Sequence, residues 1–181
     1  MKKINNIIIA IITIISYIIA LKYLKNKEYI DFLKTILILP TMLIIKIRKI
    51  NLNTNIKFAY LIFIFFAYFL GVIINLYDKI IFYDTLMHFI SGIFTAYLAL
   101  NIIKTENKII KILFILGFVS LIATTWEIFE YTSSIIFNVD PQKVVETGIN
   151  DTMKDIIVAL LGGILVVIFT NKKIEKKSLK L

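Results

Sequence analysis

The sequence predicts an all-α fold, a polytopic bundle of about six transmembrane helices, from three observations. Hydrophobic residues make up 59% of the 181 residues and the mean hydropathy is +0.87, which is more apolar surface than a soluble chain of this length can bury. The apolar residues form several runs close to the ~20 residues that cross the hydrocarbon core of a bilayer. Lysines gather in short clusters between these runs, as they do in the loops that set membrane topology.

Six apolar segments are predicted to span the membrane as a single integral membrane domain covering residues 1–181. They lie near residues 4–24, 30–47, 56–76, 80–103, 109–131 and 151–170. The first has the charged start of a signal peptide, but its apolar run is long and no A-x-A cleavage site follows, which predicts an uncleaved span. The second holds Asp31, Lys34 and Pro40, so it is either a kinked span or a partly interfacial helix.

The distribution of basic residues predicts the orientation. With six spans, 14 of the 21 Lys and Arg residues fall on one side of the membrane and 7 on the other. Because cytoplasmic loops carry the excess of basic residues, both termini are predicted to lie in the cytoplasm. The membrane is predicted to be the inner, or cytoplasmic, membrane of the cell. If the second segment does not cross, the N-terminus moves to the other side. In both cases the polar ends of the last three segments share one face, which the charge distribution makes extracytoplasmic.

Composition excludes some classes of function. The net charge of +9 does not indicate nucleic acid binding, because the basic residues are divided among loops beside anionic lipid. The chain has no cysteine, which excludes disulfides, thiolate metal sites and cysteine nucleophiles. Membrane lipids are therefore the expected partners, with a lipid-like molecule as a candidate substrate.

Each of the last three segments places two ionisable residues at the extracytoplasmic face. The pairs are Asp84 with His88 in YDTLMHF, Glu127 with Glu130 in WEIFEY, and Asp151 with Asp155 in NDTMKD. The members of a pair are three or four residues apart and so share one helical face. An ionisable residue within a span costs ~2.5–3.5 kcal/mol even on the mildest insertion scale. Six of them at one face therefore indicate a functional site.

Structural roles can explain part of the third pair. Asp151 follows Asn150, a good N-cap residue, and a carboxylate in the first turn suits the helix dipole. Asp155 lies beyond the first turn, so capping does not explain it. Pairing with the adjacent Lys154 is not expected, because neighbouring residues on a helix point about 100° apart.

Structural roles can also explain parts of the other pairs. Glu130 can lie in the headgroup region, with Trp126 and Tyr131 as interfacial aromatic residues. The aspartate and histidine of the first pair can form a plain hydrogen-bonded pair. Glu127 is deeper in the apolar run and is harder to explain in this way.

The residue types favour a metal site. Five carboxylates on one face repel one another unless a cation balances them. An imidazole nitrogen with several carboxylate oxygens suits Zn, Mn, Fe or Mg better than a softer metal. The spacing also resembles that of carboxylate-bridged metal sites in helix bundles. All six residues are therefore predicted metal ligands, and Glu127 and Asp155 are predicted catalytic residues. The alternative is a metal-free proton relay or cation site.

Small residues follow the polar pairs and allow close helix packing. They are Ser91, Gly92 and Ala96 after the first pair, and Ala159, Gly162 and Gly163 after the third. Close packing of these helices would let their polar faces meet, although ordinary packing predicts the same contact. The polar loop 138–150 is either a lid over the site or a connection, and a connection is favoured.

Three motifs resemble a known family. YDTLMHFISG, WEIFEY and TGINDTMKD together are similar to the motifs of the YjdF-like family of small bacterial inner-membrane proteins, in the same order over residues 80–165. The polar positions of the family pattern correspond to Asp84, His88, Gly92, Glu127, Glu130, Asp151 and Asp155. A weaker likeness links the chain to VanZ-like membrane proteins, which also have an Asp/His helix and a later acidic helix start. The resemblance implies a polar membrane site but no particular reaction, since the YjdF-like family has no assigned activity.

Three functions fit these observations. The first is a metal-dependent membrane enzyme that performs hydrolytic or transfer chemistry on a lipid or envelope precursor. The second is a non-catalytic accessory membrane subunit that binds a partner through its acidic face. The third is a proton- or cation-coupled transporter, which the apolar inner halves of the last three segments disfavour.

Overall fold

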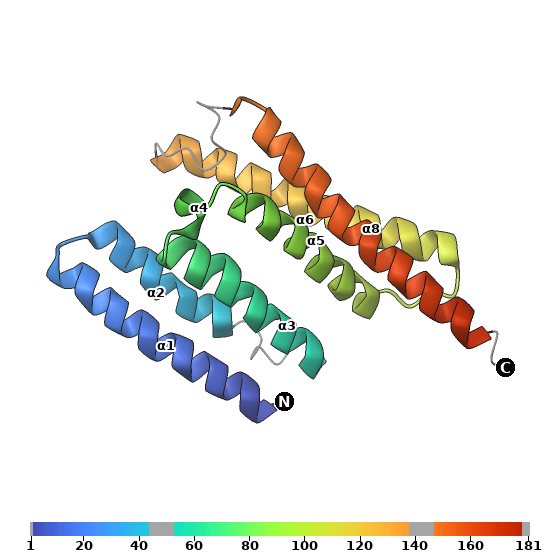
Figure 1. Ribbon diagram of the computed structural model, residues 1–181, viewed down its shortest axis with the longest axis horizontal. Helices are drawn as coiled ribbons and strands as arrows, with labels where there is room; N and C mark the ends of the chain where they lie inside the picture. The colour runs from blue at the N-terminus through green and yellow to red at the C-terminus, as the bar shows by residue number, and fades with distance from the viewer. Residues whose placement is uncertain (1, 44–52, 138–146, 179–181) are drawn as a thin grey trace. The chain divides into compact units, whose positions relative to one another are not determined.

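A computed structural model describes residues 2–43, 53–137 and 147–178 of the chain. Every regular element within these ranges is a helix, which confirms the predicted all-α class. The chain divides into two compact units, Met1–Tyr83 and Asp84–Leu181 (Figure 1). The boundary falls close to residue 80, where the motif-bearing part of the sequence begins. The single domain over residues 1–181 stays a prediction.

The described residues of unit 1, 2–43 and 53–83, form five helical elements. They are α1 (Lys2–Lys25), α2 (Tyr29–Leu43), α3 (Thr54–Ile64), the π-helical η2 (Phe65–Ile73) and the short α4 (Leu76–Lys79). Helices α1 and α2 are antiparallel neighbours, and α3 packs beside them (Figure 1). Fully buried apolar side chains from α2 and α3, among them Ile38, Met42 and Leu61, form the centre of this unit.

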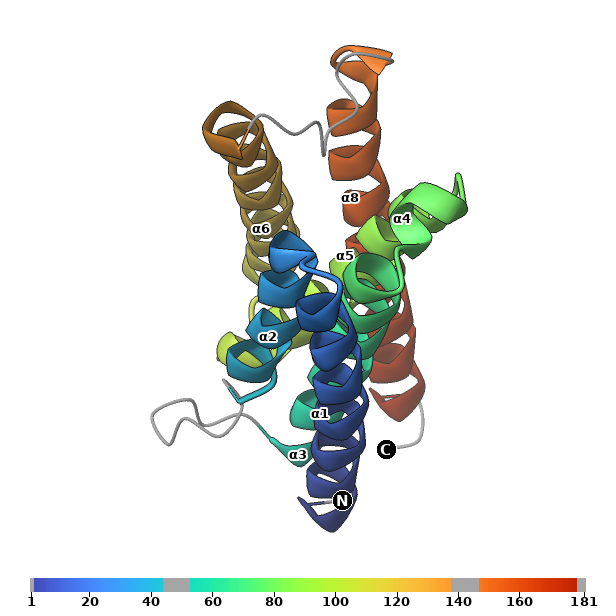
Figure 2. The same cartoon turned by 90° about the vertical axis from the view of Figure 1, so that its left-hand side faces the viewer.

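Unit 2 contains the three helices that carry the polar pairs. They are α5 (Tyr83–Ile102), α6 (Lys108–Phe137) and α8 (Asn150–Ser178). Helices α6 and α8 run antiparallel and pack against each other (Figures 1 and 2). The core shared by α5, α6 and α8 is built from small and β-branched side chains such as Ala96, Val119 and Val166, while large apolar side chains such as Leu113 and Phe169 are exposed. Small side chains in the interface with large ones on the outer surface are typical of helices that pack closely within lipid.

Five of the described helices are long and apolar enough to cross a membrane. They cover Ile4–Lys25, Thr54–Ile73, Tyr83–Ile102, Lys108–Ile136 and Asn150–Thr170. The polytopic membrane fold is thereby confirmed. The remaining predicted span, the second at residues 30–47, corresponds to α2, whose 15 described residues extend only ~22 Å along the helix axis. The rest of that segment, residues 44–47, lies outside the described residues.

Helix α6 is longer than the sequence indicated. The fifth span was expected to end near residue 131, but the helix continues to Phe137. Residues 132–137 contain no glycine or proline, and the hydroxyls of Thr132 and Ser134 donate to the carbonyl oxygens of Ile128 and Tyr131. Glu127 is therefore an interior residue of a 30-residue helix and not a helix-end residue.

Glycines bring α5 and α8 into backbone contact. A Cβ atom at Gly92 would overlap the backbone of Ala159, and one at Gly162 would overlap the backbone oxygen of Phe89. Only glycine allows this approach at either position, which is the role that small residues play between membrane helices.

This contact positions the polar residues. His88 lies one turn before Gly92 on α5, and Asp155 lies one turn before Ala159 on α8. Residues four apart share a helical face, so the close contact one turn away holds the two ionisable side chains opposite each other.

Replacing Gly92 with alanine is expected to destabilise unit 2. The added methyl group forces α5 and α8 apart, and overpacking of this kind costs about 1–3 kcal/mol. The matched control is Gly117→Ala on α6, where an added Cβ meets no described atom within 4 Å. The control should leave the thermal unfolding midpoint in detergent unchanged or raise it, because alanine favours helix over glycine. Equal midpoints for the two variants would contradict the proposed contact.

Candidate metal centre

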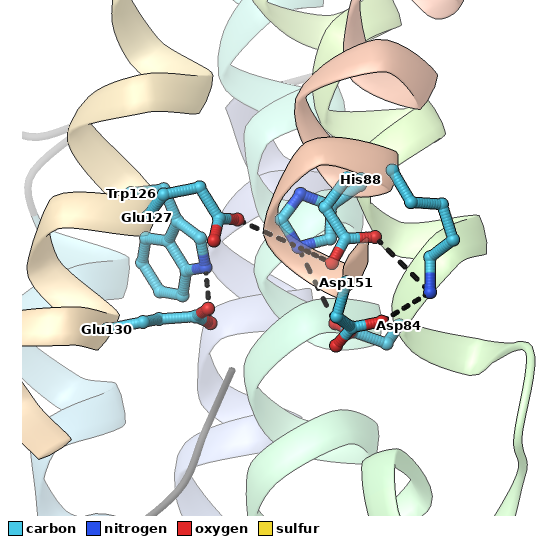
Figure 3. Close-up of polar contacts among 8 residues, drawn as sticks. Asp84, His88, Trp126, Glu127, Glu130 and Asp151 are labelled. Carbon is cyan, nitrogen blue, oxygen red and sulfur yellow. Dashed lines mark hydrogen bonds and ion pairs between the residues drawn. The ribbon is translucent and has the colours of Figure 1, made fainter. Parts of the chain in front are cut away.

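The imidazole of His88 lies at the centre of the polar cluster. Its Nε2 atom is 3.6 Å from Oδ1 of Asp84, 3.9 Å from Oδ2 of Asp155 and 4.0 Å from Oε1 of Glu127 (Figure 3). The three carboxylates come from α5, α8 and α6 respectively, so each helix of unit 2 contributes one oxygen to the surroundings of one nitrogen.

Three of these residues can share one metal ion. One ligand atom each from Asp84, His88 and Asp155 lies within 4.8 Å of the other two. Ligands bound to one ion at ~2.0–2.2 Å lie roughly 3–4 Å from each other, so only small side-chain movements are needed to bind a metal here. Helices α5 and α8, which are in backbone contact, supply all three.

Asp155 adds an independent indication that this cluster binds a ligand. The residue is 3% exposed, and its Oδ1 atom has no hydrogen-bond partner among the described residues. A buried carboxylate oxygen without a hydrogen bond is costly, and such groups are found bound to metals or other cations. The second oxygen faces His88.

Glu127 lies beside this group without belonging to it. Its side chain is buried and approaches His88, but its oxygens are not close enough to all three candidate ligands to complete the set. The position suits a fourth ligand after a rotamer change, or a base that acts on a molecule bound next to the metal.

Glu130 is held by a different partner. Its Oε1 atom accepts a hydrogen bond of 2.8 Å from Nε1 of Trp126, one turn earlier on α6. Trp126 and Tyr131 are exposed, as expected for aromatic residues at a membrane interface. The structure therefore places Glu130 at the edge of the cluster, beside exposed aromatic side chains.

Asp151 is also paired. Its Oδ1 atom accepts a hydrogen bond from Nζ of Lys154, and the same Nζ atom lies 3.9 Å from Oδ1 of Asp155. The expectation that Lys154 would not reach its neighbour Asp155 was wrong. The flexible four-carbon stem lets the ammonium group bend back over its own helix, although the two Cα–Cβ bonds diverge.

The charge balance favours a divalent cation over a proton at the centre. Three carboxylates surround His88, and protonation of the imidazole adds one positive charge against their three negative charges. A divalent cation adds two and coordinates the oxygens directly. Oxygen and imidazole ligands together fit Zn, Mn, Fe or Mg, and the identity of the metal stays a prediction.

The six predicted ligands thus divide into two sets. Asp84, His88 and Asp155 form the compact group with Glu127 adjacent, whereas Glu130 and Asp151 have hydrogen-bond partners of their own. Sequence reasoning missed the partners, Trp126 and Lys154. The i,i+4 spacing of Trp126 and Glu130 and the i,i+3 spacing of Asp151 and Lys154 were the available signals. The loop 138–150, for which a connection was favoured over a lid, falls largely outside the described residues.

Comparison with known proteins finds a distant relative with no assigned function. The chain is 31% identical over 100 residues to an uncharacterised protein of Thermotoga maritima, a match that covers 51% of this chain and 50% of the relative. The chain thus matches about half the length of this relative. No solved structure matches it.

The family assignment rests on a longer match. Residues 4–176 match the family described as "Predicted membrane protein (DUF2238)", which covers both units and every residue of the polar cluster. The motif resemblance implied an uncharacterised membrane-protein family, and this broader assignment is confirmed. The chain therefore belongs to the DUF2238 family of predicted membrane proteins.

Proposed function

We propose that this protein is a metal-dependent membrane enzyme that performs hydrolytic or transfer chemistry on a lipid or envelope precursor. Asp84, His88 and Asp155 hold one divalent cation, and Glu127 acts as the general base. The observation that carries the proposal is the position of His88 Nε2, which lies within 4.0 Å of a carboxylate oxygen from each of three helices.

The site suits the activation of water. A divalent cation at this position would make a coordinated water acidic enough to act as hydroxide at neutral pH. Glu127 approaches the cluster from α6, the helix that supplies none of the three candidate ligands, and can accept the proton of that water. In hydrolysis the hydroxide would form a bond to the phosphorus or carbonyl carbon of the substrate, and the bond from that atom to the leaving oxygen would break. Glu127 would then return the proton to the leaving oxygen.

The depth of the cluster favours a substrate with its reactive group at headgroup level. His88 and Asp155 each lie five residues after the first residue of their helix, or ~8 Å along the axis. A phosphate or ester group at the lipid–water boundary reaches this level while its chains stay in the hydrocarbon. We place this boundary on the extracytoplasmic side of the cell membrane, with the C-terminus in the cytoplasm, on the basis of the lysine distribution. The N-terminus lies in the cytoplasm as well if α2 crosses the membrane as the sixth span.

The alternatives have less support. A transporter needs polar groups that continue across the membrane, but among the fully buried polar residues described in unit 2 only Thr95 lies deeper than the cluster. An accessory subunit needs an accessible acidic face, whereas Glu127, Asp151 and Asp155 are buried. The finer likeness to YjdF-like proteins is likewise a proposal, supported by the three motifs.

Replacing Glu127 with glutamine tests the proposed chemistry. We expect the variant to keep its metal and to lose turnover by about 10²–10⁴-fold, the usual contribution of general base catalysis. Release of phosphate or alcohol would be measured from a panel of lipid phosphates and lipid esters in vesicles, with metal-loaded protein. Glu106→Gln, an exposed acid on the same unit, is the matched control. Equal turnover of the two variants, or turnover that survives chelation, would exclude the proposed mechanism.

A further inference from the structure

Lys154 is a basic side chain that contacts the acidic cluster. Its ammonium group donates a hydrogen bond to Asp151 and lies 3.9 Å from Asp155. The side chain of Lys154 is 45% exposed, whereas those of Asp151 and Asp155 are 6% and 4% exposed. The ammonium group therefore lies between solvent and two buried carboxylates.

Asp155 is shared between this ammonium group and the candidate metal centre. Its Oδ1 atom faces Lys154 at 3.9 Å, and its Oδ2 atom faces His88 at 3.9 Å. Neither contact is a hydrogen bond, and Oδ1 has no hydrogen-bond partner in the described part of the chain. A metal ion bound to Asp155 thus has a fixed positive charge as a close neighbour.

We propose that the ammonium group of Lys154 is a built-in positive charge beside the metal centre. This charge weakens the binding of the first metal ion and prevents the binding of a second. This inference rests on the proposed metal site but not on the proposed reaction. Two positive charges that share one carboxylate repel each other, and the repulsion is large where solvent is largely excluded. The ammonium group also holds Oδ1 of Asp151, so a second ion would have to displace it from that oxygen.

Lys154→Met tests the inference because it removes the charge and keeps most of the side-chain volume. We expect the variant to bind its first Mn²⁺ or Zn²⁺ ion about tenfold more tightly or better, since a repulsive charge within a few ångströms is gone. A second ion should bind between Asp151 and Asp155. Trp126 is the single tryptophan and donates to Glu130 at the edge of the cluster, so its fluorescence can follow the titration, and elemental analysis gives the number of ions.

Two further variants make the result specific. Lys111→Met removes the same charge from the same unit, 16 residues and ~24 Å before Glu127 on α6, and should leave the affinity unchanged. The double variant Asp151→Asn/Lys154→Met removes one charge of each sign, so its first-ion affinity should return to within a few fold of the wild type. In the double variant, residues 151 and 154 are both uncharged, so it can still be measured if Lys154→Met alone folds poorly because Asp151 has lost its partner.

The outcomes separate this inference from the proposed function. Tighter binding by Lys154→Met, with wild-type affinity in the other two variants, supports it, as does binding seen only in Lys154→Met. Unchanged or weaker binding by Lys154→Met overturns the role of Lys154 and leaves the metal site standing. No binding by any variant, including the wild type, overturns both.

Discussion

Replacing His88 with alanine is expected to abolish high-affinity binding of Zn²⁺ or Mn²⁺ to the purified protein. His88 is the only histidine of the chain and there is no cysteine, so no other nitrogen or sulfur side chain of the usual metal-binding types can substitute. Loss of an outer-sphere partner already weakens metal sites 10–100-fold, so loss of the central ligand should weaken this one by more than ~100-fold.

The measurement is a metal titration combined with elemental analysis after dialysis, on protein purified without a histidine tag. Leu86→Ala removes a lipid-exposed side chain two residues earlier on the same helix and serves as the control. It should bind metal as the wild type does. If His88→Ala binds metal with wild-type affinity, the ion is held elsewhere and the candidate centre is wrong.

Replacing Asp155 with asparagine is expected to change stability in opposite directions with and without metal. Without metal, the substitution removes a buried charge whose Oδ1 lacks a hydrogen bond, so the free energy of unfolding should rise. With metal at about 100 times the dissociation constant, the wild type gains ~2.7 kcal/mol, and the variant should lose this gain. This opposite effect with and without metal is expected if Asp155 is a metal ligand, and it is not expected if Asp155 has only a structural role.

Thermal unfolding midpoints in detergent, with and without added metal, provide the measurement. Asp31→Asn is the matched control, because the side chain of this aspartate is 46% exposed, lies in unit 1 and forms an exposed ion pair with Lys34. Exposed pairs contribute little, so its stability should change by less than ~1 kcal/mol and its metal response should be intact. A variant Asp155→Asn that is less stable without metal, or equally stabilised by it, would refute a ligand role.

Much of the architecture could be predicted from the sequence because lipid leaves few choices. A backbone in hydrocarbon must satisfy its own hydrogen bonds, so a long apolar run implies a helix. Helical periodicity then indicates which polar residues share a face. The meeting of Asp84, His88 and Asp155 followed from this spacing together with the small residues one turn deeper. The backbone contact of Gly92 with Ala159 supplies the physical reason.

The details that sequence reasoning missed depend on how far a long side chain can extend, and not on which face of the helix its Cβ atom occupies. Lys154 and Asp155 diverge at their Cβ atoms, yet a long flexible stem brings the ammonium group to 3.9 Å from the carboxylate. Glu130 was grouped with the metal ligands, but an indole one turn earlier holds its carboxylate. The fifth span was expected to end near residue 131, but α6 continues to Phe137, and the hydroxyls of Thr132 and Ser134 donate to its backbone.

X-ray absorption at the zinc edge of the zinc-loaded protein tests the central claim most directly. The proposed centre predicts one imidazole nitrogen at ~2.0–2.1 Å with carboxylate or water oxygens at ~2.0–2.2 Å. It also predicts that the imidazole signal vanishes in His88→Ala. A wild-type spectrum with oxygen ligands alone would contradict a metal centre built around His88.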